Sequence, residues 1–122
     1  GFPVVSKEKP QDQIIENISS QEANDLIQEN KDNPDFVILD VRTPGEFDGG
    51  HIEDAVNLDF YSGIFEDELD KLDINKTYVV YCQSGGRSGS ALNMMKEIGF
   101  MEVYNILGGI SSWKAGGFPV VN

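Results

Sequence analysis

The sequence predicts an α/β fold in which helices cover both faces of a five-stranded parallel sheet. Its 122 residues match the usual size of one domain with a single hydrophobic core. Continuous apolar runs at 36–39 and 78–82 are typical of parallel strands that are buried on both faces. These runs alternate with segments of helical periodicity, and that alternation indicates β-α units whose strands run parallel.

Local signals place the elements along the chain. Ser19 and Glu22 fit a capping box between an expected strand at 14–18 and the first helix. The segment 43–46 offers a cap, a proline at the first helical position and a glutamate at the third, which predicts a short helix. The other expected elements are strands at 36–41, 55–58, 77–81 and 103–106, and helices near 65–72, after the loop 82–88 and around Trp113.

The charge balance excludes some partners. The chain carries 9 basic and 21 acidic residues, a formal charge of −12. It lacks the basic stripe with which proteins displace counterions from nucleic acid, so no nucleic-acid partner is expected. Anionic small molecules are repelled overall, and any anion site must be built locally. No apolar run approaches the roughly 20 residues of a membrane-spanning helix.

The two ends of the chain raise a question about domain organisation. Residues 1–12 are polar and contain prolines, as in a tail or linker, and the domain is expected at 13–122. The motif Gly-Phe-Pro-Val-Val at 1–5 recurs at 117–121. It is either a chance recurrence or artefact, or the end of a preceding similar domain in a tandem array. A start without methionine is typical of a processed piece, and one free cysteine favours the cytosol but is compatible with export.

Cys82 is the only cysteine, so it has no partner for an internal disulfide. With His51 as the only histidine, the usual four-ligand zinc site cannot be assembled, and neither a metal nor a cofactor is expected. A lone cysteine in a globular domain is more often an inert core residue than a nucleophile. Its surroundings must therefore decide between the two.

Those surroundings favour a nucleophile. Cys82 follows the strand at 77–81 and precedes a glycine-rich loop that opens a helix, at the edge of the sheet where ligands bind in such folds. Backbone N–H groups of the loop, the helix dipole and the charge of Arg87 all stabilise a thiolate, and comparable settings lower a cysteine pKa from about 8.5 to ~3.5–7.5. The simpler alternative is an ordinary turn with a buried cysteine. The loop reads Cys82-Gln83-Ser84-Gly85-Gly86-Arg87-Ser88.

This loop resembles the active-site loop of rhodanese domains, which commonly reads Cys-Arg-Ser-Gly-x-Arg-Ser. The segment 40–47, followed by Gly50-His51-Ile52, Ala55 and Asn57, is similar to a second signature of that family. The segment 107–110 with Trp113 and 117–120 is similar to its C-terminal pattern. The resemblance covers residues 13 to 121 and implies the rhodanese-like three-layer fold.

The resemblance also implies an activity, the transfer of a sulfane sulfur. The Cys82 thiolate would attack the outer sulfur of thiosulfate or a persulfide, and a thiol or cyanide would then remove the sulfur. The loop from Gln83 to Ser88 would hold the persulfide through its N–H groups, while Arg87 would orient the loop or bind the donor. The implied partners are these small sulfur compounds and, as a further candidate, a sulfur-acceptor protein.

Two details of the loop refine this expectation. Four residues separate Cys82 from Arg87, whereas the related phosphatases have a loop one residue longer, so the ring suits sulfur better than phosphate. Gln83 stands where many relatives carry arginine, which removes a charge that would hold thiosulfate.

Other residues of the matching segments have expected structural roles. Asp40 and Arg42 would form a buried pair or hold the loop, and Glu46 would cap its helix. His51 would be a structural hydrogen-bonding residue, and Trp113 would belong to the core. An apolar rim near the site, or a partly buried patch, is expected from Phe60, Tyr61 and Phe65.

Two alternatives to sulfur transfer remain at this stage. A phosphatase or arsenate reductase would use the same Cys–Arg loop, although the loop is short for it. A non-catalytic module would use the fold to bind a protein or regulate an attached enzyme, although such modules usually lose the cysteine.

Overall fold

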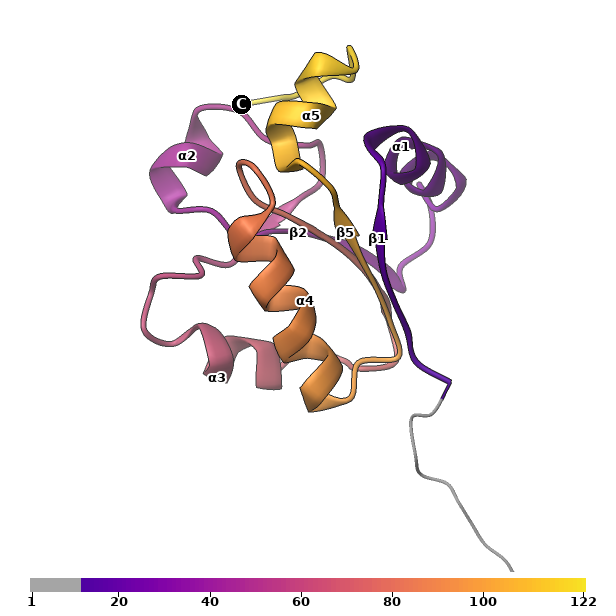
Figure 1. Ribbon diagram of the computed structural model, residues 1–122, viewed down its shortest axis with the longest axis vertical. Coiled ribbons are helices and arrows are strands. Elements are labelled where there is room, and N and C mark those ends of the chain that lie inside the picture. The colour runs from indigo at the N-terminus through magenta and orange to yellow at the C-terminus, as the bar shows by residue number, and fades with distance from the viewer. Residues whose placement is uncertain (1–11) are drawn as a thin grey trace, which may run out of the picture.

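The computed structural model describes residues 12–122 and confirms the predicted α/β fold. All strand pairs are parallel, and the five strands follow the order β1-β5-β4-β2-β3 (Figure 1). The strands are β1 (Ile14–Ile18), β2 (Phe36–Asp40), β3 (Val56–Asn57), β4 (Thr77–Tyr81) and β5 (Glu102–Ile106). The helices are α1 (Ser20–Glu29), α2 (Pro44–Asp48), α3 (Phe65–Asp70), α4 (Gly86–Ile98) and α5 (Gly109–Ala115).

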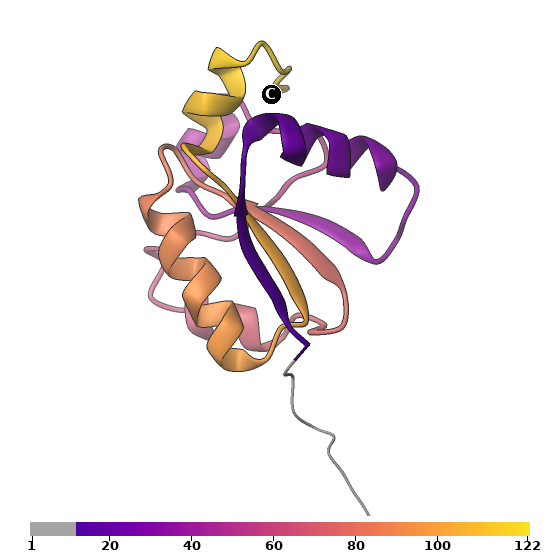
Figure 2. The same cartoon turned by 45° about the vertical axis from the view of Figure 1, so that its right-hand side comes forward.

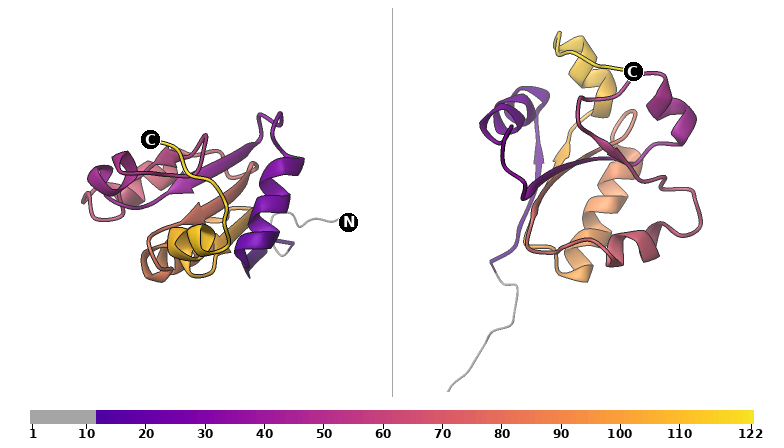
Figure 3. Two further views of the ribbon diagram at one scale, coloured as in Figure 1. Left: turned by 90° about the horizontal axis from the view of Figure 1, so that it is seen from above. Right: turned by 180° about the vertical axis from the view of Figure 1, so that it is seen from behind.

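The helices form two layers around the sheet. One core contains buried side chains of α3 and α4, and the other contains buried side chains of α1 and α5. Figure 2 shows α4 and α1 on opposite sides of the strands. Helix α2 lies beyond the carboxyl end of β2. The C-terminal end of the chain lies beside the loop that follows α2, where Val121 forms an antiparallel bridge with His51 (Figure 3). The C-terminal segment thereby fixes the loop that follows α2.

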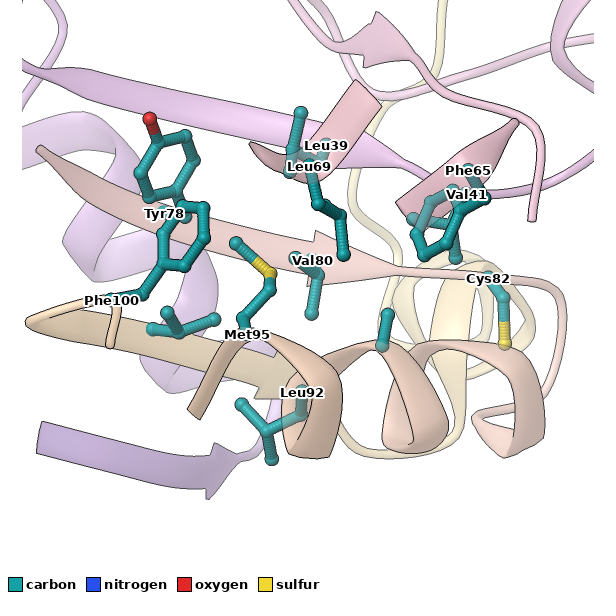
Figure 4. Close-up of a cluster of buried hydrophobic side chains, with 12 residues drawn as sticks. Leu39, Val41, Phe65, Leu69, Tyr78, Val80, Cys82, Leu92, Met95 and Phe100 are labelled. Carbon is teal, nitrogen blue, oxygen red and sulfur yellow. The ribbon is translucent and has the colours of Figure 1, made fainter. Parts of the chain in front are cut away.

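The central strand β4 explains how the two cores are divided. Successive side chains of a strand point to opposite faces, so Tyr78 and Val80 enter the core under α4 while Val79 and Tyr81 enter the other. All four are at most 1% exposed. Figure 4 shows the first of these cores running from Tyr78 to Cys82, and the thiol is its last member toward the carboxyl end of the sheet.

Several expected boundaries shift. Both capping boxes form as predicted, at Ser19 for α1 and at Thr43 for α2. Strand β3 has two residues instead of the expected four, because this edge strand pairs only with the last two residues of β2. Helix α3 ends at Asp70, and Lys71 closes it two residues earlier than expected.

Some features of the sequence lie outside this description. The N-terminal copy of the repeated motif, at 1–5, is outside the described residues. In the part of the chain that is described, no helix is both long and apolar enough to cross a bilayer. The longest, α4, has 13 residues.

Candidate active site

Cys82 lies where strand β4 ends and the loop to α4 begins. Strand β4 lies between β2 and β5 in the sheet, so the segments that follow these three strands meet around Cys82. The residue is only 1% exposed, and its sulfur lies against the first turn of α4 (Figure 4). The thiol is therefore surrounded by backbone N–H groups of a helix start rather than by water.

Hydrogen bonds to the sulfur favour the thiolate. The Gly85 N–H donates to Sγ at 3.0 Å, and the Ser88 hydroxyl donates at 3.4 Å. Burial by itself raises the pKa of Cys82. The Ser88 side chain and the backbone N–H groups of Ser88, Gly85 and Ser84 more than offset that effect, so the pKa lies below its ordinary value. The loop thus stabilises negative charge on a buried sulfur.

The backbone of the loop is held from behind by helix α5. The N–H of Ile110 donates to the carbonyl of Cys82 at 2.9 Å, and the N–H of Ser111 donates to the carbonyl of Gln83 at 3.1 Å. These bonds satisfy two loop carbonyls on the side of α5. Gly109 permits the approach, because a Cβ there would lie 2.4 Å from the Cys82 carbonyl oxygen.

Gly109 therefore belongs to the support of the site, a role that the sequence analysis did not assign. Its φ of +61° lies in the left-handed region, which disfavours a side chain. The signal was present in the sequence as the pair Gly108-Gly109 after an apolar strand. The packing of this loop against the one that contains Cys82 leaves no local pattern in the sequence.

Asp40 and Arg42 lie at and just after the end of β2, close to the loop that follows β4. They form a buried ion pair, with Arg42 Nη2 and Asp40 Oδ2 2.7 Å apart. The same Nη2 donates to the carbonyl of Gly50 at 2.7 Å, while Nη1 donates to Oε1 of Gln83 at 3.4 Å. The Gln83 side chain also donates to Ser111 Oγ at 3.0 Å. Arg42 thus connects the end of β2 to the loop after β4.

Arg87 is bound by Glu46, an ion pair that the sequence analysis did not predict. Its Nη1 and Nη2 donate to the two carboxylate oxygens at 2.8 and 3.0 Å. Hydrogen bonding to Arg87, reinforced by Thr43 against the effect of burial, lowers the pKa of Glu46 to about 2. Glu46 is the cap of α2, as expected, and it also anchors the arginine of the loop. The guanidinium carbon lies 5.4 Å from the ring centre of Tyr61.

We expect acid to remove the stabilisation that this ion pair provides. The pKa of Glu46 falls from 4.5 to about 2 on folding, so the unfolded chain binds the proton first. The contribution is therefore present above about pH 4.5 and is lost between about 4.5 and 2. Urea unfolding of the protein and of Glu46→Gln measures it, since glutamine keeps the capping geometry. The difference in unfolding free energy should shrink with falling pH, and a constant difference would contradict the ion pair.

The remaining expected residues fall into structural and peripheral positions. His51 stacks on Phe47, and its Nδ1 lies 2.9 Å from the Phe47 carbonyl oxygen, which fits a structural role. Trp113 is 2% exposed and belongs to the core, as predicted. Of the expected apolar rim, Phe65 is buried, Phe60 is half-buried against the same core, and Tyr61 is 68% exposed. The exposed ring of Tyr61 therefore offers an apolar surface beside Arg87.

Within residues 12–122 no group of three or more His, Cys, Asp or Glu side chains is placed to hold a metal ion. A cavity of about 260 Å³ lies between α1 and β2, and no residue of the loop 82–88 lines it. The chemistry available here is that of a thiol whose negative form is stabilised by the hydrogen-bond donors of its loop. Fold and site together define an α/β domain with a cysteine-containing loop at the carboxyl edge of a parallel sheet.

Comparison with known proteins identifies the family. A family model described as the rhodanese-like domain matches residues 19–116. A protein named sulfurtransferase from Allochromatium vinosum is 31% identical over 104 residues, covering 85% of this chain and 95% of that protein. Thiosulfate sulfurtransferase GlpE of Coxiella burnetii is 35% identical over 102 residues, covering 84% and 90%. An uncharacterised protein of Synechocystis sp. is 40% identical over 85 residues, and the chain spans about half of it, 46%.

Comparison with solved structures points to the same family. The crystal structure of a rhodanese-related protein from Thermoplasma volcanium superposes with a TM-score of 0.72 and 29% identity, covering 87% of this chain and 97% of that one. A rhodanese-like domain from Anabaena sp. gives a TM-score of 0.72 at 25% identity, covering 87% and 78%. The chain therefore belongs to the rhodanese-like family, and it has relatives named sulfurtransferase along most of its length.

Proposed function

We propose that this protein is a sulfurtransferase that carries sulfane sulfur as a persulfide on Cys82. The observation that carries the proposal is the setting of the sulfur: it accepts hydrogen bonds from the Gly85 N–H and the Ser88 hydroxyl at the start of α4. These donors stabilise a thiolate before the reaction, so no general base is needed. The same donors would also stabilise the outer, anionic sulfur of the Cys82 persulfide.

The reaction has two balanced steps. In the first, the Cys82 thiolate attacks the outer sulfur of a donor R–S–SH, the S–S bond of the donor breaks, and Cys82–S–SH and a thiolate R–S⁻ result. With thiosulfate the same attack releases sulfite and leaves the anionic persulfide Cys82–S–S⁻. In the second step an acceptor thiolate or cyanide takes the outer sulfur and regenerates the Cys82 thiolate. The loop from Gln83 to Ser88 stabilises the sulfur through both steps.

The ion pair between Arg87 and Glu46 argues against phosphate chemistry at this loop. A phosphatase uses its arginine to hold the phosphoryl oxygens, but the charge of Arg87 is balanced by Glu46, to which it donates through two of its five N–H groups. The short spacing between Cys82 and Arg87 points the same way. A sulfur atom needs only the backbone donors, which are in place.

Intact-mass spectrometry under non-reducing conditions tests the proposal. Incubation with thiosulfate, and separately with a small persulfide, should add the mass of one sulfur atom to the protein. Subsequent addition of cyanide or a thiol should remove that mass and yield thiocyanate or a new persulfide. Prior alkylation of Cys82 should prevent the gain. The proposal is wrong if neither donor produces a Cys82 adduct.

A further inference from the structure

The two arginines of the sequence are both neutralised at the site. Arg42 is paired with Asp40 at 2.7 Å, and Arg87 is paired with Glu46 at 2.8 Å. Two positive and two negative side chains therefore cancel around a sulfur that is itself anionic when it reacts. What remains to attract an anion is the set of N–H groups that already face Cys82.

The lysines in the described residues stand elsewhere. Lys96 and Lys114 lie in the last turns of α4 and α5, whose first turns face the loop. Lys76 precedes β4 at the opposite end of the sheet from Cys82. Lys31 and Lys71 pair with surface carboxylates, and two further lysines lie outside the described residues.

Gln83 leaves the charge of the site unchanged. Its amide lies between Arg42 and Ser111, accepting a hydrogen bond from the first and donating one to the second. Its side chain is thus held at the wall of the loop by the charged guanidinium of Arg42 on one side and the neutral hydroxyl of Ser111 on the other. A positively charged residue in this position would add an unpaired charge to the loop, and glutamine supplies none.

We infer that the donor is a persulfide without negative charge beyond its reacting sulfur, and that thiosulfate is discriminated against by charge. The inference rests on the proposed function and names the substrate class of that site. Thiosulfate brings two negative charges and leaves as sulfite with both of them, beside a reacting thiolate and without an unpaired guanidinium. The overall charge of −12 opposes its approach as well. A neutral or cationic persulfide meets neither obstacle.

A pair of matched donors tests this inference. Cysteamine persulfide and mercaptopropionate persulfide have similar size but opposite charge at the far end. Intact mass gives the rate at which each persulfide loads sulfur onto Cys82. Each rate is divided by the rate at which the same persulfide transfers sulfur to mercaptoethanol, an uncharged thiol, which corrects for the intrinsic reactivity of the donor. The cationic donor should load roughly tenfold faster at low salt, the gap should narrow with added salt, and thiosulfate should be slowest. Equal normalised rates would overturn the inference and leave the proposed function intact.

Variants separate the local effect from the overall charge. Glu46→Gln releases Arg87 and should accelerate both anionic donors roughly tenfold while cysteamine persulfide gains little. Glu68→Gln is the matched control, because it removes an equal charge from a surface lysine pair on α3. Equal acceleration in both variants would refute a local cause. Should Glu46→Gln unfold, Gln83→Arg should favour thiosulfate and Gln83→Glu should oppose it. Failure of every donor would refute the proposed function itself.

Discussion

Replacement of Cys82 by serine should abolish sulfur loading and transfer while the protein stays folded. A serine hydroxyl keeps its proton at neutral pH and forms no persulfide, so no mass gain is expected with any donor. The fold should survive because serine is smaller than cysteine and its oxygen still lies within reach of the Gly85 N–H. We expect a change in unfolding free energy of about 1–2 kcal/mol.

Two measurements on the same variant keep this prediction decisive. Circular dichroism and urea unfolding establish whether Cys82→Ser retains the native structure, and intact mass with each donor establishes whether it is loaded. A folded variant that still transferred sulfur would refute the persulfide mechanism, because Cys82 is the only cysteine in the sequence. A second substitution, Cys82→Ala, should give the same loss of loading, which separates the missing thiol from any effect of the introduced hydroxyl.

The inner strands of the sheet could be predicted because they are largely buried, β4 on both faces. The run that became β4 is uniformly apolar, and the structure buries its side chains in two separate cores. Strand β3 was expected to be longer than it is. Its length is set by pairing with the last two residues of β2 at the edge of the sheet, a tertiary contact that leaves little local pattern.

The loop around Cys82 could also be located from sequence, but its supports could not. Glu46 and Arg87 are 41 residues apart, and they meet because β2 and β4 are neighbours in the sheet. Gly109 reaches the Cys82 carbonyl because β5 flanks β4 on the other side. The order of strands in a parallel sheet is decided by packing rather than by local patterns. Contacts between the loops that follow them are therefore invisible to periodicity and capping signals.

Replacement of Gly109 by alanine should damage both stability and sulfur loading. The added Cβ would lie 2.4 Å from the carbonyl oxygen of Cys82 and 2.6 Å from that of Gln83, so the backbone must shift. The left-handed φ of +61° adds a further cost. Together these effects should lower the unfolding free energy by roughly 2–5 kcal/mol, from ~1–2 for the backbone conformation and ~1–3 for overpacking. Urea unfolding measures this change.

The same displacement should slow loading of Cys82 in whatever fraction of Gly109→Ala remains folded. The bonds from Ile110 and Ser111 fix the carbonyls of the loop, and the N–H groups facing the sulfur are oriented with them. Gly89→Ala is the matched control, since it also adds one methyl group near the loop but has no atom within 4 Å of its Cβ and lies inside α4. That variant should be more stable by ~0.4–1 kcal/mol and load sulfur normally. Equal behaviour of the two variants would mean that α5 does not hold the loop.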